Sequence, residues 1–244
     1  MKKIFFFLFI FAAFVSRSMA QQATLQEDLA LKYLVQLPAE KPEKAQRMPV
    51  IILLHGYGSD EKDLFDLRNF FPKNYLIVSV RAPYALSAGG YQWYEGTTAD
   101  GQRDGKKDQL DNSRTLIMKF ESEVVKKYKA DAKNVYLIGF SQGAIMSYEA
   151  GLTNPGVIRG IGVLSGMIFN SLRGQIRNTP TLKQLKIFIS HGTDDQRIAY
   201  SEAKTANDYL KVLGLKPDFH TYDGMGHQIN KEVLKDLLAW LNNK

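Results

Sequence analysis

The stretch NVYLIGFSQGA, residues 134–144, decides how the rest of this sequence is interpreted. It opens with a short apolar run typical of a buried strand and continues into the small residues of a tightly packed helix. Between the two lies the motif GFSQG, centred on Ser141. A serine on a strained strand-to-helix turn needs small neighbours two positions away, because larger side chains would clash with the strand and the helix. The pattern therefore predicts that Ser141 is a nucleophile at the end of a strand.

A serine hydroxyl reacts poorly unless a base removes its proton, and in this chain order the base is a downstream histidine. His191, His220 and His227 follow Ser141. His220 lies inside the expected strand DFHTY, where a structural role fits better, and His191 precedes the candidate acids. His227 lies in the loop GMGH before the last expected helix, from which an imidazole can reach over the strand ends. We therefore expect His227 to be the base.

The acid that orients the imidazole is expected after the strand LKIFISHG, where Asp194 and Asp195 stand side by side. Spacing alone does not separate them. Either one can also be an ordinary turn or cap residue ahead of the helix expected over 201–213.

Two backbone N–H groups are expected to stabilise the oxyanion of a tetrahedral intermediate. One belongs to Gln142, directly after the nucleophile, and the other to Tyr57 in the turn HGYG, residues 55–58. The glycines of that turn let the backbone reverse, although a simple turn would also contain them.

Apolar side chains near the expected strand ends are candidates for a substrate cleft. Trp93 lies in the segment GGYQWYE, and Ile168 and Phe169 follow the expected strand GIGVLSG. Ligand pockets are lined mostly by apolar and aromatic side chains, so these three are candidates to contact the substrate. The alternative is that they are ordinary core packing.

Strands and helices alternate on both sides of the central motif. Strands are expected at 31–37 (an edge strand), 50–56, 75–80, 134–139, 160–166, 185–192 and 218–222. Helices are expected from Ser59 or Asp60 to Phe71, and at 108–128, 142–152, 201–213 and about 229–241. This alternation predicts an α/β fold with a mostly parallel central sheet and helices on both faces.

The first twenty residues have the features of a secretory signal peptide. Lys2 and Lys3 precede an apolar run from Ile4 to Val15, and small residues surround the expected cleavage site after Ala20. The run is shorter than the about 20 apolar residues that cross a bilayer, which argues against a membrane anchor. We expect residues 1–20 to be removed and 21–244 to form a single exported domain, periplasmic or secreted.

Composition excludes several classes of function. The sequence contains no cysteine, which excludes disulfides, cysteine-based catalysis and a lipid anchor on cysteine. Lys2, Lys3 and Arg17 account for three of the formal charge of +7, so +4 remains after the leader is removed. This small excess is scattered among acidic residues and is typical of a solvated surface, so we expect no nucleic-acid partner.

Six segments, taken in order, resemble the phospholipase/carboxylesterase family, which includes the acyl-protein thioesterases: LLHGYGSDEKDL, SVRAPY, GGYQWYE, GFSQGA, HGTDDQRI and YDGMGHQI. The similarity runs from about Pro49 to the C-terminus. It implies an α/β-hydrolase fold and ester hydrolysis without a cofactor or a metal. In the family's acid motif the catalytic Asp stands four residues after the His of the His-Gly pair, which here is Asp195.

The sequence departs from the family pattern in three places. The acid motif ends in Arg197-Ile198-Ala199, where the family usually has two branched residues and proline, and Ala144 replaces a frequent glycine. The third departure is the leader, because many members are cytosolic. An export signal argues against removal of acyl groups from proteins inside a cell.

The residues and the resemblance together predict a serine carboxylic-ester hydrolase. Ser141 attacks the carbonyl of a small or medium acyl or aryl ester, His227 transfers the proton, Asp195 orients the imidazole, and the amides of Tyr57 and Gln142 hold the oxyanion. An exported esterase of polysaccharide side chains (feruloyl or acetyl), a peptidase or an acyltransferase are alternatives, because they share the chemistry up to the acyl-enzyme. Outside enzymes, the alternative is a catalytically inactive binding protein.

Overall fold

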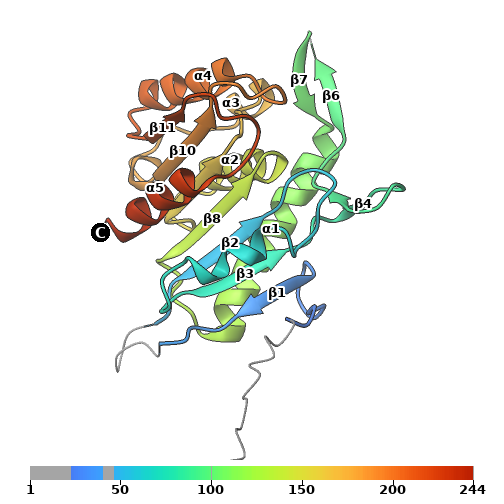
Figure 1. Ribbon diagram of the computed structural model, residues 1–244, viewed down its shortest axis with the longest axis vertical. Helices are drawn as coiled ribbons and strands as arrows, with labels where there is room; N and C mark the ends of the chain where they lie inside the picture. Colours follow the sequence, from blue (N-terminus) through green and yellow to red (C-terminus); the bar gives the residue numbers. More distant parts are fainter. Residues whose placement is uncertain (1–22, 41–46, 100, 244) are drawn as a thin grey trace, which may run out of the picture.

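Seven strands form one sheet in the order β1-β3-β2-β8-β9-β10-β11 (Figure 1). The computed structural model describes residues 23–40, 47–99 and 101–243, so the expected signal peptide lies outside the described residues. The strands are β1 (Tyr33–Gln36), β2 (Val50–Leu54), β3 (Leu76–Val80), β8 (Val135–Phe140), β9 (Gly160–Leu164), β10 (Lys186–Gly192) and β11 (Asp218–Tyr222).

Only β1 runs against its neighbour; every other neighbouring pair in this sheet is parallel. The chain therefore forms the mostly parallel sheet that the sequence predicts, with β1 at its edge. Because parallel strands end at one edge of a sheet, the segments that follow β2, β8, β9, β10 and β11 all begin at the same end of the molecule.

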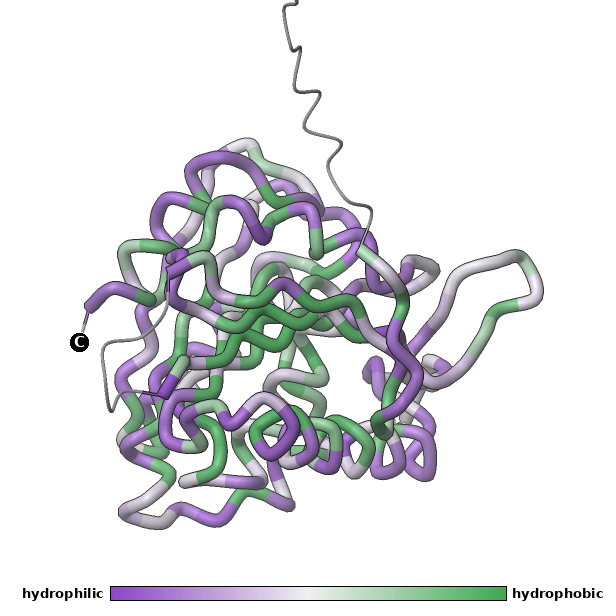
Figure 2. The backbone as a smooth tube through the Cα atoms, turned by 90° about the horizontal axis from the view of Figure 1, so that it is seen from below, coloured by the Kyte–Doolittle hydropathy of each residue, from purple (hydrophilic) through white to green (hydrophobic). Residues whose placement is uncertain are grey.

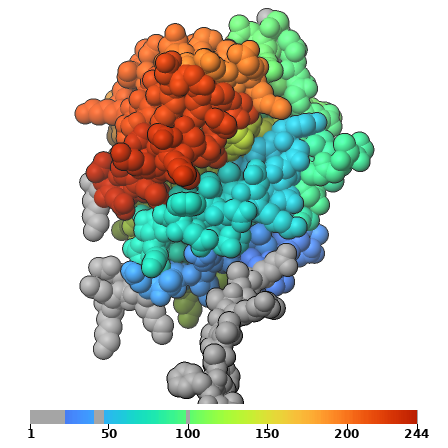
Figure 3. Space-filling view, viewed as in Figure 1, coloured from blue at the N-terminus to red at the C-terminus, as the bar shows by residue number. Residues whose placement is uncertain are grey.

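Helices cover both faces of the sheet. One face carries α1 (Lys107–Tyr128), α2 (Gln142–Thr153) and α4 (Tyr200–Val212), and the other carries the 3₁₀ helix η1 (Leu64–Asn69) and α5 (Lys231–Asn242). Side chains alternate along each strand, so Ile52 packs into the first core and Ile51 into the second. Hydrophobic segments accordingly lie in the interior (Figure 2), and α5 and the region of η1 form one surface (Figure 3).

The helix expected from Ser59 or Asp60 to Phe71 is wrong in type and extent: only the short η1 forms. The Asp60 side chain accepts a hydrogen bond from the N–H of Lys62, which makes a turn at that point. Glu61 is buried and bonds the Arg81 guanidinium at 2.6 and 2.8 Å. This buried ion pair fixes the first half of the segment as turns, and the tertiary contact overrides the apolar spacing.

Two short antiparallel ribbons and two short helices were not anticipated. The ribbons are β4 (Tyr84–Ala85) with β5 (Tyr91–Gln92) and β6 (Gly96–Ala99) with β7 (Gln102–Gly105), and the helices are α3 (Asn170–Arg173) and η2 (Leu182–Gln184). The β6–β7 hairpin stands out from the sheet beside α3 and α4 (Figure 1). Within the described residues, no helix combines the length and the apolar character that crossing a bilayer requires.

Candidate active site

Ser141 sits at the junction of β8 and α2 in a strained backbone conformation, with φ 54° and ψ −116°. Two glycines make this turn possible. A Cβ added to Gly139 would lie 2.1 Å from the carbonyl oxygen of Gly143, and one added to Gly143 would lie 2.0 Å from that of Leu54. Any larger residue would force strand and helix apart, so the small residues of the motif are a steric requirement of the turn.

The structure brings Ser141, His227 and Asp195 into one line of hydrogen bonds. The Nε2 atom of His227 lies 2.8 Å from the Ser141 hydroxyl, and its Nδ1 atom lies 2.7 Å from Oδ2 of Asp195. A carboxylate only accepts, so Nδ1 carries the proton and Nε2 is free to accept the serine proton. A Cβ on Gly192 would lie 1.9 Å from the Met225 carbonyl, so glycine allows β10 to approach the loop that carries His227.

Asp195 is buried, and both of its carboxylate oxygens accept hydrogen bonds. Its Oδ1 accepts from the N–H groups of Arg197 at 2.8 Å and Ile198 at 2.9 Å, while Oδ2 faces His227. Burial opposes ionisation, but the hydrogen bonds from His227, Ile198 and Arg197 outweigh it and lower the pKa of Asp195 below its usual value. Asp194 is exposed, and its carboxylate bonds the Thr193 hydroxyl. Of the two aspartates left open by spacing, only Asp195 contacts the imidazole.

A second histidine lies behind Asp195. His191 is fully buried, with Nε2 2.8 Å from the Ile198 carbonyl and 3.3 Å from Oδ2 of Asp195. Burial lowers its pKa, which keeps the ring neutral. His191 therefore helps to fix the turn that holds the acid. Because His191 precedes the candidate acids in the chain, the sequence argued against it as the base. Its place at the end of β10 was the signal that it lies beside the acid turn.

The turn that carries Tyr57 lies against the elbow that carries Gln142. A Cβ on Gly56 would lie 3.4 Å from Cβ of Ser141, so the turn containing Tyr57 packs directly against the serine. In the described part of the chain, neither the Tyr57 N–H nor the Gln142 N–H donates a hydrogen bond to another backbone group. Both donors are therefore available to a ligand at Ser141.

Residues 37–244 match the model of the Phospholipase/Carboxylesterase family. The chain belongs to this family. It is 30% identical to the probable carboxylesterase SOBER1-like of Arabidopsis thaliana over 209 residues, covering 80% of this chain and 78% of the relative. It is 31% identical to acyl-protein thioesterase 1 of Mycosarcoma maydis over 216 residues, covering 78% and 89%. The chain is a carboxylesterase-like serine hydrolase.

The fold comparison agrees with this membership. The crystal structure of a carboxylesterase from Mesorhizobium loti matches with a TM-score of 0.77 at 22% identity, covering 91% of this chain and 99% of that one. The α/β-hydrolase fold and the family resemblance read from the sequence are therefore confirmed.

In this family member, the turn 55–58 is held from two directions. The His55 ring is buried, its Nδ1 donating to the Gly56 carbonyl at 2.7 Å and its Nε2 accepting from the Ala82 N–H at 3.0 Å. Burial lowers the pKa of His55, which favours this neutral form. The Trp93 indole N–H donates to the His55 carbonyl at 2.9 Å. Sequence reasoning did not anticipate either contact.

The Gln142 side chain joins this support to the elbow. Its Oε1 accepts from the Trp93 N–H at 2.7 Å and its Nε2 donates to the Tyr94 carbonyl at 2.7 Å. Trp93 thus bonds the turn 55–58 through its ring and the Gln142 side chain at the elbow through its backbone. We call the hydrogen bonds joining His55, Trp93, Tyr94 and Gln142 the Trp93 clamp.

The three apolar candidates for the substrate cleft occupy different places. Trp93 has no exposed surface, so core packing describes its position, because its indole needs the buried His55 carbonyl as acceptor. Phe169 is also buried and packs edge-on against Tyr94, with ring centroids 5.6 Å apart. Ile168 lines a cavity of about 310 Å³.

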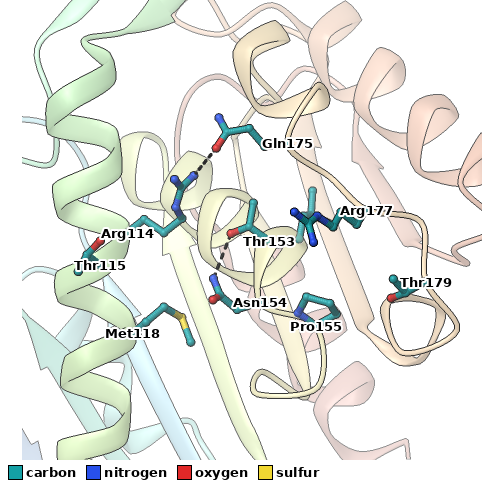
Figure 4. Close-up of a pocket in the computed structure, with 10 residues that line it drawn as sticks. Arg114, Thr115, Met118, Thr153, Asn154, Pro155, Gln175, Arg177 and Thr179 are labelled. Atoms are coloured by element: carbon teal, nitrogen blue, oxygen red, sulfur yellow. Dashed lines mark hydrogen bonds between the residues drawn. The ribbon is translucent and has the colours of Figure 1, made fainter.

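A separate cavity of about 590 Å³ lies between α1, the end of α2 and the segment 175–179 (Figure 4). Arg114 donates to Gln175 at its rim, and Asn154 and Pro155 form the side nearest the end of α2. Ser141 lies at the other end of α2, and Ser141, His227 and Asp195 do not border this cavity. It is therefore distinct from the site at the elbow.

Proposed function

We propose that this chain hydrolyses small or medium carboxylic esters through an acyl-enzyme formed on Ser141. The observation that carries the proposal is the unbroken line from the Ser141 hydroxyl through the His227 ring to Asp195, with both hydrogen bonds between 2.7 and 2.8 Å. A strained serine beside an imidazole oriented to accept its proton is the arrangement that nucleophilic catalysis needs.

The reaction follows from the roles of these groups. The Ser141 oxygen forms a bond to the ester carbonyl carbon while Nε2 of His227 takes its proton. Collapse of the tetrahedral intermediate breaks the bond to the alcohol oxygen, which leaves with the proton returned by His227. A water molecule, deprotonated by the same ring, then attacks the acyl-enzyme and releases the acid and free Ser141. Asp195 holds the proton of Nδ1 in place throughout.

The Tyr57 and Gln142 amides are proposed to stabilise the negative charge that develops on the carbonyl oxygen. The Trp93 clamp supports this assignment, because it ties the turn that carries Tyr57 to the residue that carries the other donor. Donors held before the substrate arrives need no reorganisation during the reaction, which is why buried hydrogen bonds behind them favour catalysis.

Replacing Ser141 tests the proposal. Ser141→Ala should lower kcat for para-nitrophenyl butyrate by roughly four to six orders of magnitude while leaving the melting temperature close to that of the native chain. Ser201→Ala, an exposed serine on α4, is the matched control and should keep full activity. A fluorophosphonate probe should label the native chain on Ser141. Absence of an adduct, with no ester hydrolysis, would favour the inactive binding protein.

We also propose that the chain is exported, with residues 1–20 removed and 21–244 forming one catalytic domain. The charged start, apolar run and small residues before Gln21 support this. N-terminal sequencing of the protein from its native host should begin at Gln21. Uncleaved protein in the cytoplasm would overturn the assignment. Esters of rising acyl length, with feruloyl and acetyl-sugar esters beside them, would define the natural substrate.

A further inference from the structure

A polar cavity of about 310 Å³ lies between the β6–β7 hairpin, the segment after β9, α3 and α4. Its walls include Gln102, Arg103, Ile168, Asn170, Arg173 and Glu202. Two arginines in so small a space are unusual for a site that binds an uncharged acyl chain, because apolar pockets are the rule for such groups. The lining indicates recognition of a charged group.

The walls of the cavity are linked to the segments that carry the reacting groups, although Ser141, His227 and Asp195 do not themselves line it. Ser141 donates its N–H to the carbonyl of Leu164 at 2.9 Å, and Ile168 follows only four residues later. On the opposite wall, the Arg103 guanidinium donates to the carbonyl of Arg197, two residues after Asp195. Two residues of chain span at most about 7 Å, so the guanidinium lies within a short acyl chain's reach of the acid loop. The hairpin lies at the carboxyl ends of the parallel strands, the end of the sheet that carries Ser141, Asp195 and His227 (Figure 1).

The hairpin is held in place by side-chain hydrogen bonds to α3. Asn170 donates to the Gln102 side chain at 3.1 Å, and the Ser171 hydroxyl donates to Asp104 at 2.8 Å. Together with the Arg103 contact to the acid loop, these bonds close the cavity on two sides. A ligand would therefore meet a preformed wall, which lowers the entropy cost of binding.

Neither guanidinium group has a carboxylate partner within the described residues. Among the described residues, the ion pairs within 4.0 Å engage other arginines, Arg68, Arg81 and Arg114, and include neither Arg103 nor Arg173. The Arg173 Nε atom is buried without a hydrogen-bond partner in that part of the chain, while its guanidinium lies 5.0 Å from the Tyr209 ring centre. The Nη groups of Arg173 donate no side-chain hydrogen bond within the described residues, and they could bind a carboxylate in the cavity.

We propose that this cavity binds a carboxylate carried by the ester substrate, with Arg103 and Arg173 as its partners. Glu202 is the one acid among the lining residues, so the formal charge of the cavity is +1, which matches a monoanion. The inference rests on the proposed function: the preferred substrates are esters whose acyl or alcohol part ends in a carboxylate several bonds from the reacting carbonyl.

Two matched pairs of substrates test this. The acyl pair is the para-nitrophenyl monoester of adipic acid and its neutral methyl ester. The alcohol pair is the butyrate ester of 3-(4-hydroxyphenyl)propanoic acid and that of its amide. In at least one pair the carboxylate substrate should have a kcat/KM about tenfold higher, as expected for hydrogen bonds between charged groups. Added salt should reduce the ratio, because the site opens to solvent.

Variants attribute the preference to the cavity. Arg173→Gln should bring the selectivity ratio close to one, whereas Arg177→Gln, the same change in the separate cavity of Figure 4, should leave it as in the native chain. Arg103→Gln serves as the second variant if the first does not fold. A native selectivity ratio near one in both pairs would overturn the inference, and so would equal losses of selectivity in the Arg173 and Arg177 variants. In either case, Ser141-dependent hydrolysis of neutral esters would still support the proposed function. If no ester is hydrolysed, both fail.

Discussion

The two ends of the parallel strands both collect charged side chains, but they organise them differently. At the carboxyl ends, Ser141, His227 and Asp195 bond one another in sequence. At the amino ends, a cavity of about 820 Å³ is bordered by cations that include Arg159 and Lys186. Burial, and then the charge of Arg159, lower the pKa of Lys186, whose hydrogen-bond partner there is a backbone carbonyl of Asn243.

The difference shows that the density of polar groups does not identify the reactive end of this fold. The amino-end cavity of about 820 Å³ is larger than the cavity of about 310 Å³ beside α3, yet its cations repel one another and neither a serine nor a histidine lines it. At the carboxyl ends Ser141, His227 and Asp195 each have a defined partner, and the line of partners ends on a strained serine. Substitutions at the carboxyl ends should therefore change chemistry, and those at the amino ends should change only stability.

After the loss of Ser141 itself, the largest effect is expected from Asp195→Asn. The amide cannot hold the Nδ1 proton as a carboxylate does, so the His227 ring can adopt the wrong tautomer, and kcat should fall by roughly four orders of magnitude. Asp194→Asn makes the same chemical change one residue away on an exposed side chain and should cost less than about tenfold. Steady-state kinetics on both variants checks this. A larger loss in the Asp194 variant would show that the acid is misassigned.

The next effect is on stability and concerns Glu149 in α2, the helix that runs from the elbow toward the other end of the sheet. Burial raises the pKa of Glu149 to about 7, against 4.5 for an ordinary glutamate, although Arg114 opposes the shift. Between these two values the unfolded chain loses its proton first, so the free energy of unfolding falls as pH rises and levels off above pH 7. The loss is on the order of 3 kcal/mol.

Urea unfolding at pH 5 and pH 8 checks this expectation. Burial also raises the pKa of Glu121 to about 7, so two carboxyl groups contribute to the pH dependence. Glu149→Gln should remove about half of it, because the amide does not titrate. An unchanged difference between the two pH values would mean that Glu149 is already ionised in the folded chain.

Tryptophan gives a direct comparison of the two ends, since the chain has two. Trp93→Phe keeps an aromatic ring but leaves the His55 carbonyl without its donor, so the turn bearing Tyr57 loosens. We expect kcat to fall about tenfold with little change in KM, and the affinity for a trifluoromethyl ketone, which forms a tetrahedral adduct, to fall by the same factor. The Trp240 ring packs on Tyr136 and Phe188, so Trp240→Phe should lower stability and leave kcat unchanged.

If the two tryptophan changes lowered kcat equally, the Trp93 clamp would have no positioning role in catalysis. If Trp93→Phe lowered stability but left the ketone affinity unchanged, Trp93 would be a core residue and nothing more.

Local sequence patterns predicted most of the elements and the place of Ser141 at a strand-to-helix turn, because strand, glycine turn and helix follow one another within eleven residues around it. His227 was predictable from chain order and its loop. Asp195 was not separable from Asp194 by spacing, because the choice depends on which carboxylate accepts the amides of Arg197 and Ile198. Only the family resemblance favoured it in advance.

What escaped prediction depends on contacts between distant residues. The β6–β7 hairpin has a polar sequence with no apolar alternation, and it is fixed by partners more than sixty residues away, such as Asn170. The burial of Trp93 depends on a carbonyl at His55, which no pattern within one segment reveals. The same holds for η1, where the buried Glu61 ion pair to Arg81 replaced a helix.

The smallest effect is expected at the amino ends, from Lys186→Met. Methionine keeps the apolar stem of the half-buried lysine but removes a charge that faces Arg159, so the free energy of unfolding at pH 7 should rise by up to about 0.5 kcal/mol, within the range of surface changes. Because the folded pKa of Lys186 is lowered, the native chain recovers stability as pH rises toward the ordinary lysine value of 10.5. The advantage of the variant should therefore shrink at alkaline pH, whereas Lys183→Met, at an exposed position, should show no such trend. Esterase activity should be unchanged, since none of the residues bonded to Ser141 or Asp195 lies in this cavity. A loss of kcat in the Lys186 variant would mean that the two ends of the sheet are coupled. Substitutions at the amino ends would then affect chemistry as well as stability.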